Sequence, residues 1–272
     1  MPTDPEPAEN LGGGYGRLLD AAPASDPETR AATVVHRLGE LYWRKSYGDR
    51  DAFTCLVRTI LSQNTSDVAS QPAFDALLDR FEGDEFARSL ADASQDEIVE
   101  AIKGAGLYNR KARVIRSVAG RMLEEYGGAE GFDEYVRDAP VEDVREELLS
   151  MDGVGPKTAD CVLLFSAGRD GVFPVDTHVH RIYRRLGVAP PDADHEAVRR
   201  LLEGAIPAED CGFGHTTSIQ FGREYCTARR PACLDGQEAC PLGDVCDRVG
   251  VDPTTETVVD PVDTDNDEHG SG

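Results

Sequence analysis

The sequence predicts an all-α protein, and three observations support this fold class. From about Pro27 nearly to Cys226, apolar residues recur at intervals of three and four, which is the period of amphipathic helices. Short stretches rich in glycine and proline interrupt this pattern and divide it into successive helices. The chain contains neither a convincing run of alternating apolar and polar residues, which would predict a strand, nor an internal repeat.

The expected helices follow one another closely along the chain. The first two are predicted by apolar residues spaced by three and four: Val34, Val35, Leu38, Leu41 and Tyr42, then Phe53, Leu56, Ile60 and Leu61. Further helices are expected at roughly 67–80, 95–104, 109–126, 141–150, 156–168, 176–187, 192–204 and 214–225. The breakers between them are Gly104–Gly106, Gly127-Gly128, Gly153–Gly155, Gly168–Gly171 and Pro190-Pro191.

Both ends of the chain are expected to be disordered arms. Residues 1–28 are rich in proline, glycine, alanine and acid, and residues 251–272 are polar and acidic. Such stretches contain too few apolar residues to bury a core of their own.

Composition narrows the class of protein. With 40% hydrophobic and 29% charged residues, the chain of 272 residues is typical of a soluble globular protein. No window approaches eighteen apolar residues, and the first residues are acidic and proline-rich. We therefore expect no membrane span and no secretory signal, and a protein that stays in the cytoplasm.

The formal net charge of −23 is unusual for a protein that binds nucleic acid. The terminal arms carry −5 and −7 of it, which leaves −11 for residues 29–250. Lysine is scarce, with four residues against 24 arginines. Excess acid with few lysines suggests adaptation to high salt, as in a halophile, where charge keeps the surface solvated. At roughly 1 M salt the Debye length is about 3 Å, so repulsion of DNA would be largely screened.

Four cysteines near the C-terminus form the pattern C-x6-C-x6-C-x5-C: Cys226, Cys233, Cys240 and Cys246. In a reducing compartment, clustered cysteines are more often metal ligands than disulfides. Thiolates are the usual ligands of iron–sulfur clusters, and four of them also suit zinc. The remaining cysteines lie singly in helical patterns, where we expect them to be buried apolar residues.

A glycine turn between two helices is predicted around residues 151–155. Val141–Ser150 is amphipathic, and Pro156 suits the first position of the next helix. The glycines at 153 and 155 permit a tight turn and close approach of a ligand to the backbone. The N-terminus of the second helix offers N–H groups and a positive dipole end to a phosphate. This pattern predicts a helix–hairpin–helix; a tight helical turn with no ligand is the alternative.

Lys157 follows at the second position of that helix. A cation at a helix N-terminus is disfavoured, by roughly 0.3–1 kcal/mol, which lowers the lysine pKa and favours the neutral, nucleophilic amine. A surface lysine that binds phosphate is the alternative. Asp176 precedes another helix, where it would act as a plain N-cap or, paired with Lys157, stabilise a cationic sugar transition state. His178 and His180 are expected to support packing.

Together these residues resemble the endonuclease III family of helix–hairpin–helix DNA glycosylases and AP lyases. Five segments carry the resemblance in order: Ile60–Asp67, Gly106–Ala112, Gly153–Thr158, Val175–His178 and the four cysteines. The resemblance covers roughly residues 30–248. It implies two helical lobes with a DNA-binding cleft between them: a barrel at 46–170, and a second lobe of 29–45 plus 171–250 that holds the cluster.

The resemblance also implies the chemistry. Lys157 matches the position of the nucleophile and Asp176 that of the essential aspartate. The enzyme would remove a damaged base, expected to be an oxidised pyrimidine, through a lysine Schiff base and then cut the strand by β-elimination. Its partner would be double-stranded DNA containing damaged bases or abasic sites, bound by a monomer. The four cysteines would hold a [4Fe–4S] cluster.

Three groups of residues are expected to contact DNA by the same resemblance. Asn64, with Gln63 beside it, matches the position that fills the hole left by a flipped base. Backbone and phosphate contacts are expected from the hairpin and from basic side chains: Gly153, Val154, Gly155, Arg110, Lys111, Arg229 and Arg230. A buried amide at the end of a helix and a solvated basic helix face are the respective alternatives.

The sequence departs from the family pattern at two places. The usual middle gap between cysteines is x2, whereas here it is x6, Leu234–Ala239, which is four residues longer. Ser150-Met151-Asp152 stands where relatives often have Leu-Pro before the glycine. Two other functions stay open: a glycosylase for G·T or G·U mismatches, and a non-catalytic protein that binds damaged DNA.

Overall fold

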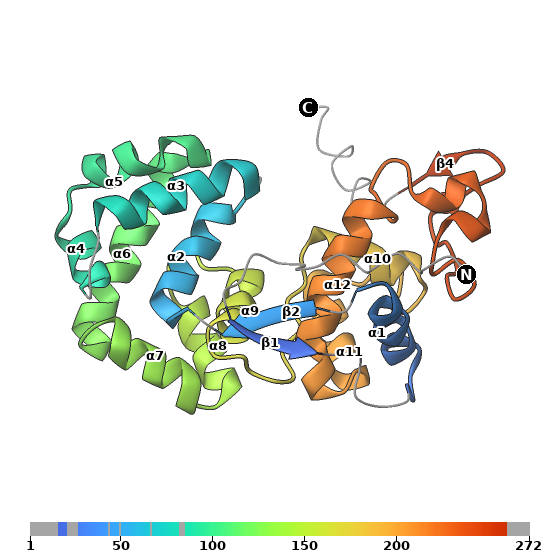
Figure 1. Ribbon diagram of the computed structural model, residues 1–272, viewed down its shortest axis with the longest axis horizontal. Helices are drawn as coiled ribbons and strands as arrows, with labels where there is room; N and C mark the ends of the chain where they lie inside the picture. Colours follow the sequence, from blue (N-terminus) through green and yellow to red (C-terminus); the bar gives the residue numbers. More distant parts are fainter. Residues whose placement is uncertain are drawn as a thin grey trace, which may run out of the picture. The chain divides into compact units, whose positions relative to one another are not determined.

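The computed structural model describes residues 27–42, 50–65, 67–81 and 85–259, with the backbone alone at 16–20, 44–48 and Asp67. These residues are mostly helical and divide into two compact units (Figure 1). One unit, here called the hairpin unit, comprises residues 50–169. The other, here called the cysteine unit, comprises 27–42 and 170–259. The chain thus starts in the cysteine unit, crosses to the hairpin unit and returns.

Helix α2 is the centre of the hairpin unit. Eight of its eleven residues are buried, and it packs against α3, α6, α7 and α9. The helices and the 3-10 turn of this unit are α2 (Ala52–Ser62), α3 (Asp67–Arg80), α4 (Phe86–Asp92), α5 (Gln95–Ile102), η1 (Lys103–Ala105), α6 (Tyr108–Tyr126), α7 (Ala129–Asp138), α8 (Val141–Leu149) and α9 (Pro156–Phe165).

Local sequence sets where these helices begin and end. Asp51 caps α2, since its carboxylate accepts from the backbone N–H of Thr54. Ser94 and Glu97 form a capping box at the start of α5. Gly127 ends α6 in the left-handed conformation that glycine adopts without strain.

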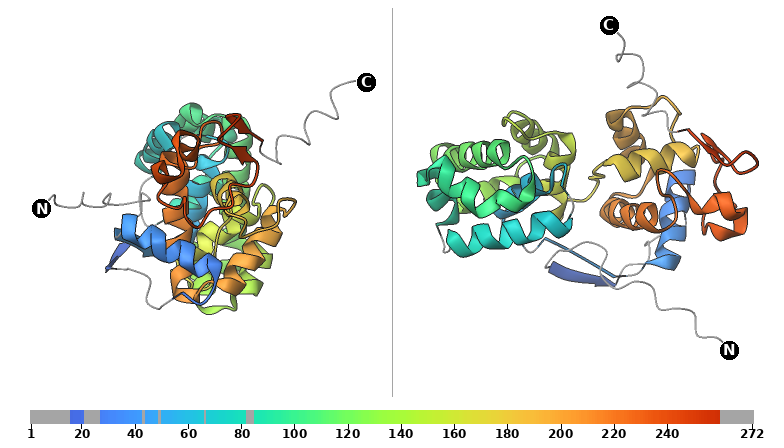
Figure 2. Two further views of the ribbon diagram at one scale, coloured as in Figure 1. Left: turned by 90° about the vertical axis from the view of Figure 1, so that its right-hand side faces the viewer. Right: turned by 90° about the horizontal axis from the view of Figure 1, so that it is seen from above.

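The cysteine unit is built around α12, which packs against α1 and α10. Its elements are α1 (Arg30–Leu41), α10 (Thr177–Arg185), α11 (His195–Ala205), η2 (Ala208–Asp210), α12 (Cys211–Glu224), η3 (Ala232–Asp235), η4 (Gln237–Ala239), β3 (Val251–Asp252) and β4 (Thr257–Val258). Helix α1, in blue, lies beside the orange α12 although the two are far apart in sequence (Figure 2). Gly214 makes this approach possible, because a Cβ there would lie 2.7 Å from the Phe173 ring and 2.8 Å from Val35.

The structure differs from the sequence-based expectation in its short elements. Helices α4 and α7 were not expected; both are short and bury only two or three apolar side chains each. Strands β1 (Gly16–Asp20) and β2 (Arg44–Gly48) form a two-stranded sheet. Residues 1–15 and 21–26 of the N-terminal arm lie outside the described residues.

The start of the C-terminal arm also has regular structure. Strands β3 and β4 pair antiparallel, with Val251 opposite Val258. The reason is apolar: Val251 is buried against the cavity that the four cysteines line, which ties down a segment of otherwise polar composition. Residues 260–272 lie outside the described residues.

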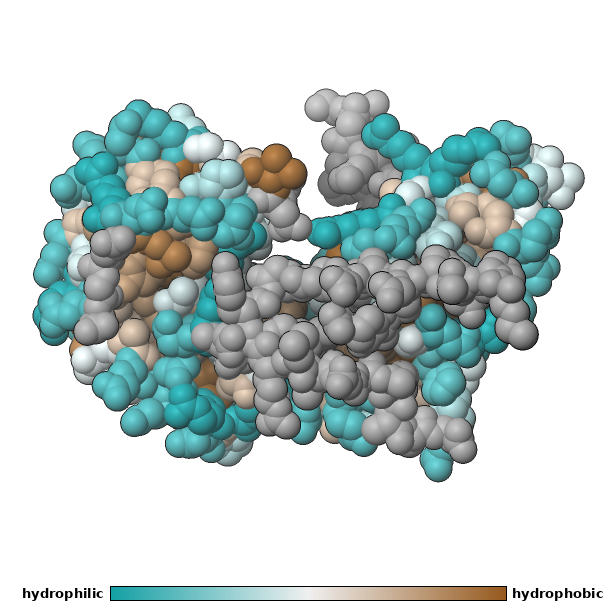
Figure 3. Space-filling view, in the orientation of Figure 1, coloured by the Kyte–Doolittle hydropathy of each residue, from teal (hydrophilic) through white to brown (hydrophobic). Residues whose placement is uncertain are grey.

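The visible surface of both units is mainly hydrophilic (Figure 3). In the part of the chain that the structure describes, no helix is long and apolar enough to cross a membrane.

Candidate functional site

The turn between α8 and α9 has the hairpin geometry that the sequence predicts. Gly153 has φ +81°, and a Cβ there would lie 2.6 Å from Cγ2 of Val114. Only glycine fits this position, on both counts. The Val154 N–H donates to the Met151 carbonyl at 3.1 Å and closes the turn. Gly155, the N-cap of α9, faces open space, so a ligand can approach its backbone closely.

Gln63 supports this turn from the end of α2. Its side-chain Nε2 donates to the Gly153 carbonyl at 3.1 Å and to Oγ1 of Thr158 at 3.0 Å. The amide therefore holds the turn and the first turn of α9 together. Gln63 lies beside Asn64 as expected, but the contacts of its amide are to the hairpin.

Lys157 is the second residue of α9 and is half-buried. Its helix is fixed to α8 by a buried ion pair, in which Nε of Arg145 lies 2.7 Å from Oδ1 of Asp160. The lysine thus lies in the first turn of a short helix whose start is set by Pro156 and by the glycine turn.

Asn64 lies in the loop between α2 and α3, exposed and with φ +50°. Asparagine tolerates this left-handed conformation better than most residues. Leu107 has φ +49° at the start of α6 and a fractional exposure of 55%. Such a conformation is costly for leucine, and exposure leaves its apolar side chain unburied. The two loops are joined by a hydrogen bond of 2.6 Å from Oγ1 of Thr65 to the Ala105 carbonyl.

Leu107 is a residue that sequence reasoning missed. Its signal was available: it is an apolar residue directly after Gly106, where the preceding apolar pattern has stopped and the next helix has not begun.

Lys111 corrects the sequence-based assignment. It was expected to contact the DNA backbone, but it is only 3% exposed and its ammonium donates three hydrogen bonds inside the hairpin unit. It belongs to the buried stripe of α6 with Ile115, Val118 and Met122, at helical spacing. Arg110, one residue earlier, is exposed and stays available to a phosphate.

Asp176 lies in the cysteine unit as the N-cap of α10. Its Oδ1 accepts from the backbone N–H groups of His178 and Val179, both at 2.9 Å. The cap therefore orients the carboxylate through one oxygen, and Oδ2 makes no hydrogen bond to the described residues. The N-cap reading and the catalytic reading are thus compatible, because they use different oxygens.

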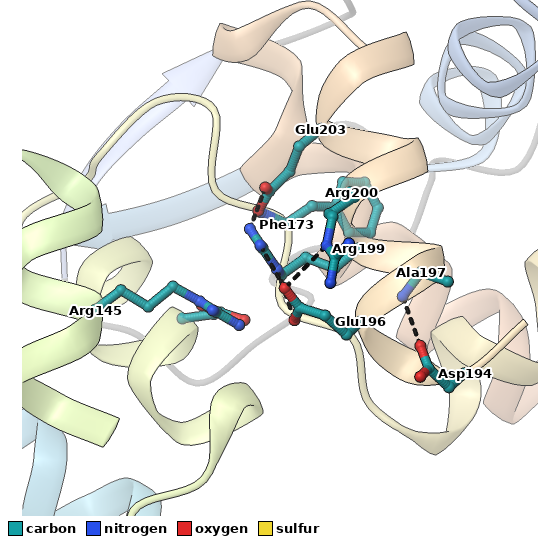
Figure 4. Close-up of polar contacts among 9 residues, drawn as sticks. Arg145, Phe173, Asp194, Glu196, Ala197, Arg199, Arg200 and Glu203 are labelled. Atoms are coloured by element: carbon teal, nitrogen blue, oxygen red, sulfur yellow. Dashed lines mark hydrogen bonds and ion pairs between the residues drawn. The ribbon is translucent and has the colours of Figure 1, made fainter. Parts of the chain in front are cut away.

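The segment that leads to Asp176 is held by α11. The backbone N–H of Phe173 donates to Oε1 of Glu203 at 3.0 Å, and Glu203 also pairs with Arg199 (Figure 4). The guanidinium of Arg199 reaches Glu196 on its other side, at 2.7 Å. These contacts hold the extended segment that precedes α10, and this segment carries Asp176.

The histidines near Asp176 make packing contacts. Nε2 of His180 lies 2.7 Å from the Ala193 carbonyl, and its ring stacks on that of His195 with centroids 4.0 Å apart. Nδ1 of His178 lies 3.0 Å from Nη2 of Arg181. Burial lowers the pKa of His178 and of His195, partly opposed by the Asp176 carboxylate, which raises both.

The four cysteines line one cavity in the cysteine unit. Its other walls are largely apolar, from Ile182, Leu186, Phe221, Tyr225, Leu242 and Val251. All four thiols are free. Burial raises the pKa of Cys240 and of Cys246 to about 11, so thiolates here need a positive ligand. Among the described residues, no three His, Cys, Asp or Glu side chains converge as for a single metal ion.

Hydrogen-bond donors face the sulfurs in this cavity. Nη1 of Arg185 lies 3.6 Å from Sγ of Cys226, and the Arg248 N–H lies 3.4 Å from Sγ of Cys246. Four sulfurs that share one apolar cavity, with N–H donors aimed at two of them, suit an anionic iron–sulfur cluster.

The loop after Cys226 is tied to α10 by buried arginines. Arg185 donates to the carbonyls of Thr227 and Ala228 at 2.7 and 2.8 Å, and Arg181 donates to the Cys226 carbonyl. Arg229 and Arg230 at the loop tip are exposed. Arg230 pairs with Asp235, which lies in the six-residue gap between the second and third cysteines, at 2.7 Å.

Comparison with known families agrees with this geometry. Residues 57–208, more than half of the chain, match the model of the HhH-GPD superfamily of base excision DNA repair proteins. The chain belongs to this superfamily. Residues 226–246 match the iron–sulfur binding domain of endonuclease III, and that segment begins and ends at cysteines of the cavity.

Relatives of the HhH-GPD protein cover most of its length. Endonuclease III of Thermotoga maritima is 33% identical over 75% of this chain and 86% of its own. Endonuclease III of Sulfolobus acidocaldarius is 31% identical over 72% of this chain and 82% of its own. A solved structure of a trapped endonuclease III–DNA covalent intermediate, with an estranged adenine, superposes with a TM-score of 0.62 at 28% identity. It covers 74% of this chain and 86% of that chain.

The expectations from sequence on fold, activity, cofactor and partner are therefore confirmed. The protein is a base-excision-repair DNA glycosylase with apurinic/apyrimidinic lyase activity, and its partner is DNA. It carries a [4Fe–4S] cluster, for which the longer middle gap between cysteines is no obstacle.

Proposed function

We propose that Lys157 is the nucleophile of this glycosylase and that Asp176 is its catalytic carboxylate. The observation that carries the proposal is the position of Lys157, directly after a glycine turn on a helix start that is braced from two sides. The carboxylate of Asp176 supports it, being oriented through one oxygen by the cap. The two units would be the two lobes of the family, each supplying residues to DNA.

Removal of the damaged base is the first stage of the reaction. The lone pair of neutral Lys157 attacks C1′ of the damaged nucleotide. The bond from C1′ to the base breaks, and the base leaves with its electron pair. The carboxylate of Asp176 stabilises the positive charge on the sugar, receives the proton of the amine and passes it to the departing base.

Strand cleavage follows from the same covalent intermediate. The sugar ring opens at O4′ to give a protonated Schiff base, which acidifies C2′. Loss of a C2′ proton expels the phosphate at C3′ and cuts the strand 3′ to the lesion. Water then hydrolyses the imine and returns Lys157 as a free amine.

The gap left by a flipped base would be filled by Asn64 and Leu107. Both are exposed, both have positive φ, and their loops are joined by the bond from Thr65 to Ala105. The amide of Asn64 suits hydrogen bonding to the orphaned partner base, and Leu107 suits apolar contact with the neighbouring bases. Arg110, Arg229, Arg230 and the backbone of the hairpin would position the phosphates.

The [4Fe–4S] cluster is held by Cys226, Cys233, Cys240 and Cys246. When bound, it supplies four iron–sulfur bonds that cross-link the loop carrying Arg229 and Arg230. The protein would work in the cytoplasm, associated with the nucleoid. Its substrates would be oxidised pyrimidines.

Substitution of Lys157 tests the catalytic proposal. K157Q keeps a polar side chain, one atom shorter, but removes the amine, so we expect no borohydride-trapped complex on abasic DNA and no strand cleavage. K103Q is the matched control, since Lys103 is exposed on η1 and pairs with Glu100. Trapping by K157Q at the wild-type level would show that another amine attacks.

A second assay separates the proposed lesion class from mismatch repair. It compares the rates at which the wild-type protein acts on a thymine-glycol duplex and on a G·T duplex.

A further inference from the structure

Lys111 is a buried cation whose hydrogen-bonding capacity is filled. Its Nζ donates to the Leu61 carbonyl at 2.7 Å, to Oγ1 of Thr65 at 2.6 Å and to the Ala105 carbonyl at 2.6 Å. A lysine ammonium has three N–H donors, and all three are used here. All three acceptors are neutral. Burial lowers the pKa of Lys111 to about 8, because removal from water disfavours the charged form.

The acceptors enclose the two residues that we assign to gap filling. Leu61, in the last turn of α2, and Thr65, in the loop after it, lie on either side of Asn64 in the sequence. Ala105 and Lys111 itself lie on either side of Leu107. One ammonium therefore joins the bases of two exposed loops whose tips have strained backbone.

Thr65 closes the arrangement. Its hydroxyl accepts from Lys111 and donates to the Ala105 carbonyl at 2.6 Å, so the two loops are bonded directly as well as through the amine. A Cβ at Gly106 would lie only 3.4 Å from this hydroxyl, which shows how closely the loops approach. The left-handed residues Asn64 and Leu107 persist only where their surroundings hold them, and this network does so.

We propose that Lys111 is a positioning residue for the wedge of Asn64 and Leu107, which holds both tips at the spacing needed to replace a flipped base. The inference rests on the proposed function, because it assigns a support to residues that the proposal places in the DNA gap. Lys111 itself contacts no DNA. Its removal disturbs base extrusion and leaves covalent chemistry at an already exposed sugar intact.

The test compares two substrates with the full-length protein. A duplex with thymine glycol requires extrusion and gap filling, whereas a single-stranded oligonucleotide with a preformed abasic site requires neither. Hydrogen bonds to a charged group are worth about 1.5–3 kcal/mol, so K111M should lower kcat/KM on the duplex about tenfold to a hundredfold. Borohydride trapping on the single strand should stay near the wild-type rate. K103M is the matched control, because Lys103 is exposed nearby.

A spectroscopic readout separates positioning from a general loss of folded protein. With 2-aminopurine as the partner base, insertion of the wedge unstacks the probe and raises its fluorescence. We expect K111M to bind the duplex with a smaller rise than wild type or K103M. A loss of active protein alone would lower the rates on both substrates by the same factor. That factor would equal the decrease in the fraction of folded protein.

T65V keeps the test decisive if K111M does not fold. It removes two hydrogen bonds from a partly exposed position, one accepted from the ammonium and one donated to the Ala105 carbonyl. The bond to the charged ammonium alone is worth about 1.5–3 kcal/mol, so we expect a loss of about tenfold or more on the duplex alone. Equal losses on both substrates, or none on the duplex, overturn the inference. N64A and L107A identify the source of a failure: if they too leave the duplex reaction unchanged, the proposed wedge is wrong, and not only its support.

Discussion

Gly153 illustrates how much of the site follows from single residues. Two glycines before a proline predicted a tight turn, and the structure has that turn with φ +81° at Gly153. What sequence could not show is the second reason for glycine there, which is the side chain of Val114 from α6 against its Cα. Long-range contacts of this kind depend on the packing of helices and leave no local pattern.

The two hairpin glycines should respond differently to alanine. G153A adds a methyl group at positive φ against Val114, and we expect it to destabilise the fold by about 1–3 kcal/mol. G155A adds a methyl group in open space at φ −99°, so its melting temperature should stay near that of wild type. Thermal unfolding of both variants measures this. A G155A variant that melts as early as G153A would mean that the turn has no such asymmetry.

Lys111 shows why a charged residue was placed wrongly from sequence. Its spacing to Ile115, Val118 and Met122 puts it on the apolar face of α6, but its charge favoured solvent exposure. Periodicity was the better guide here. The three acceptors that compensate for burial come from segments up to 50 positions away, and nothing in the local sequence announces them.

At the scale of helices, the long periodic segments were predicted well. Helices α3, α6, α8 and α11 lie within a few residues of their expected ranges. Helices α4 and α7 were missed because so few of their residues are buried, and they form by packing against α6. The four-cysteine cavity was predicted as a ligand set, whereas the apolar walls around it required the folded arrangement of α10 and α12.

The ion pair between α8 and α9 should contribute strongly to the stability of the fold. R145M leaves the carboxylate of Asp160 buried without its guanidinium, which typically costs about 3–5 kcal/mol. Urea denaturation measures the loss, with R113M on the exposed face of α6 as the control. We expect the R145M/D160L double variant to regain much of the stability, because it buries no unpaired charge. Equal stability of R145M and wild type would show that the pair does not join the helices.

At the scale of the molecule, charge and salt decide how the enzyme meets DNA. A net charge of −23 opposes binding at low ionic strength, and screening at high salt removes most of that opposition. Adaptation to salt stays a prediction from composition. The longer gap between the second and third cysteines also opposes DNA binding. Its Asp235 pairs with the exposed Arg230 and competes with a phosphate for it.

Removal of that carboxylate should therefore change affinity in a salt-dependent way. We expect D235N to bind abasic duplex several-fold more tightly than wild type at about 0.1 M salt, where the Debye length is about 10 Å. The difference should disappear near 1 M. Fluorescence anisotropy across a salt series measures it, with D244N as the control, since Asp244 pairs with Arg37 instead. Equal gains for both variants would assign the effect to net charge alone.

The short β3–β4 hairpin has a practical consequence for anyone who shortens this chain. Composition alone invites removal of everything after residue 250, yet Val251 forms part of the wall around the cysteine sulfurs. A protein cut there would admit water and dissolved oxygen to the metal, and we expect it to bleach in air faster than one cut after Val259. The lifetime of the cluster in air thus depends on a segment that looks dispensable from its composition.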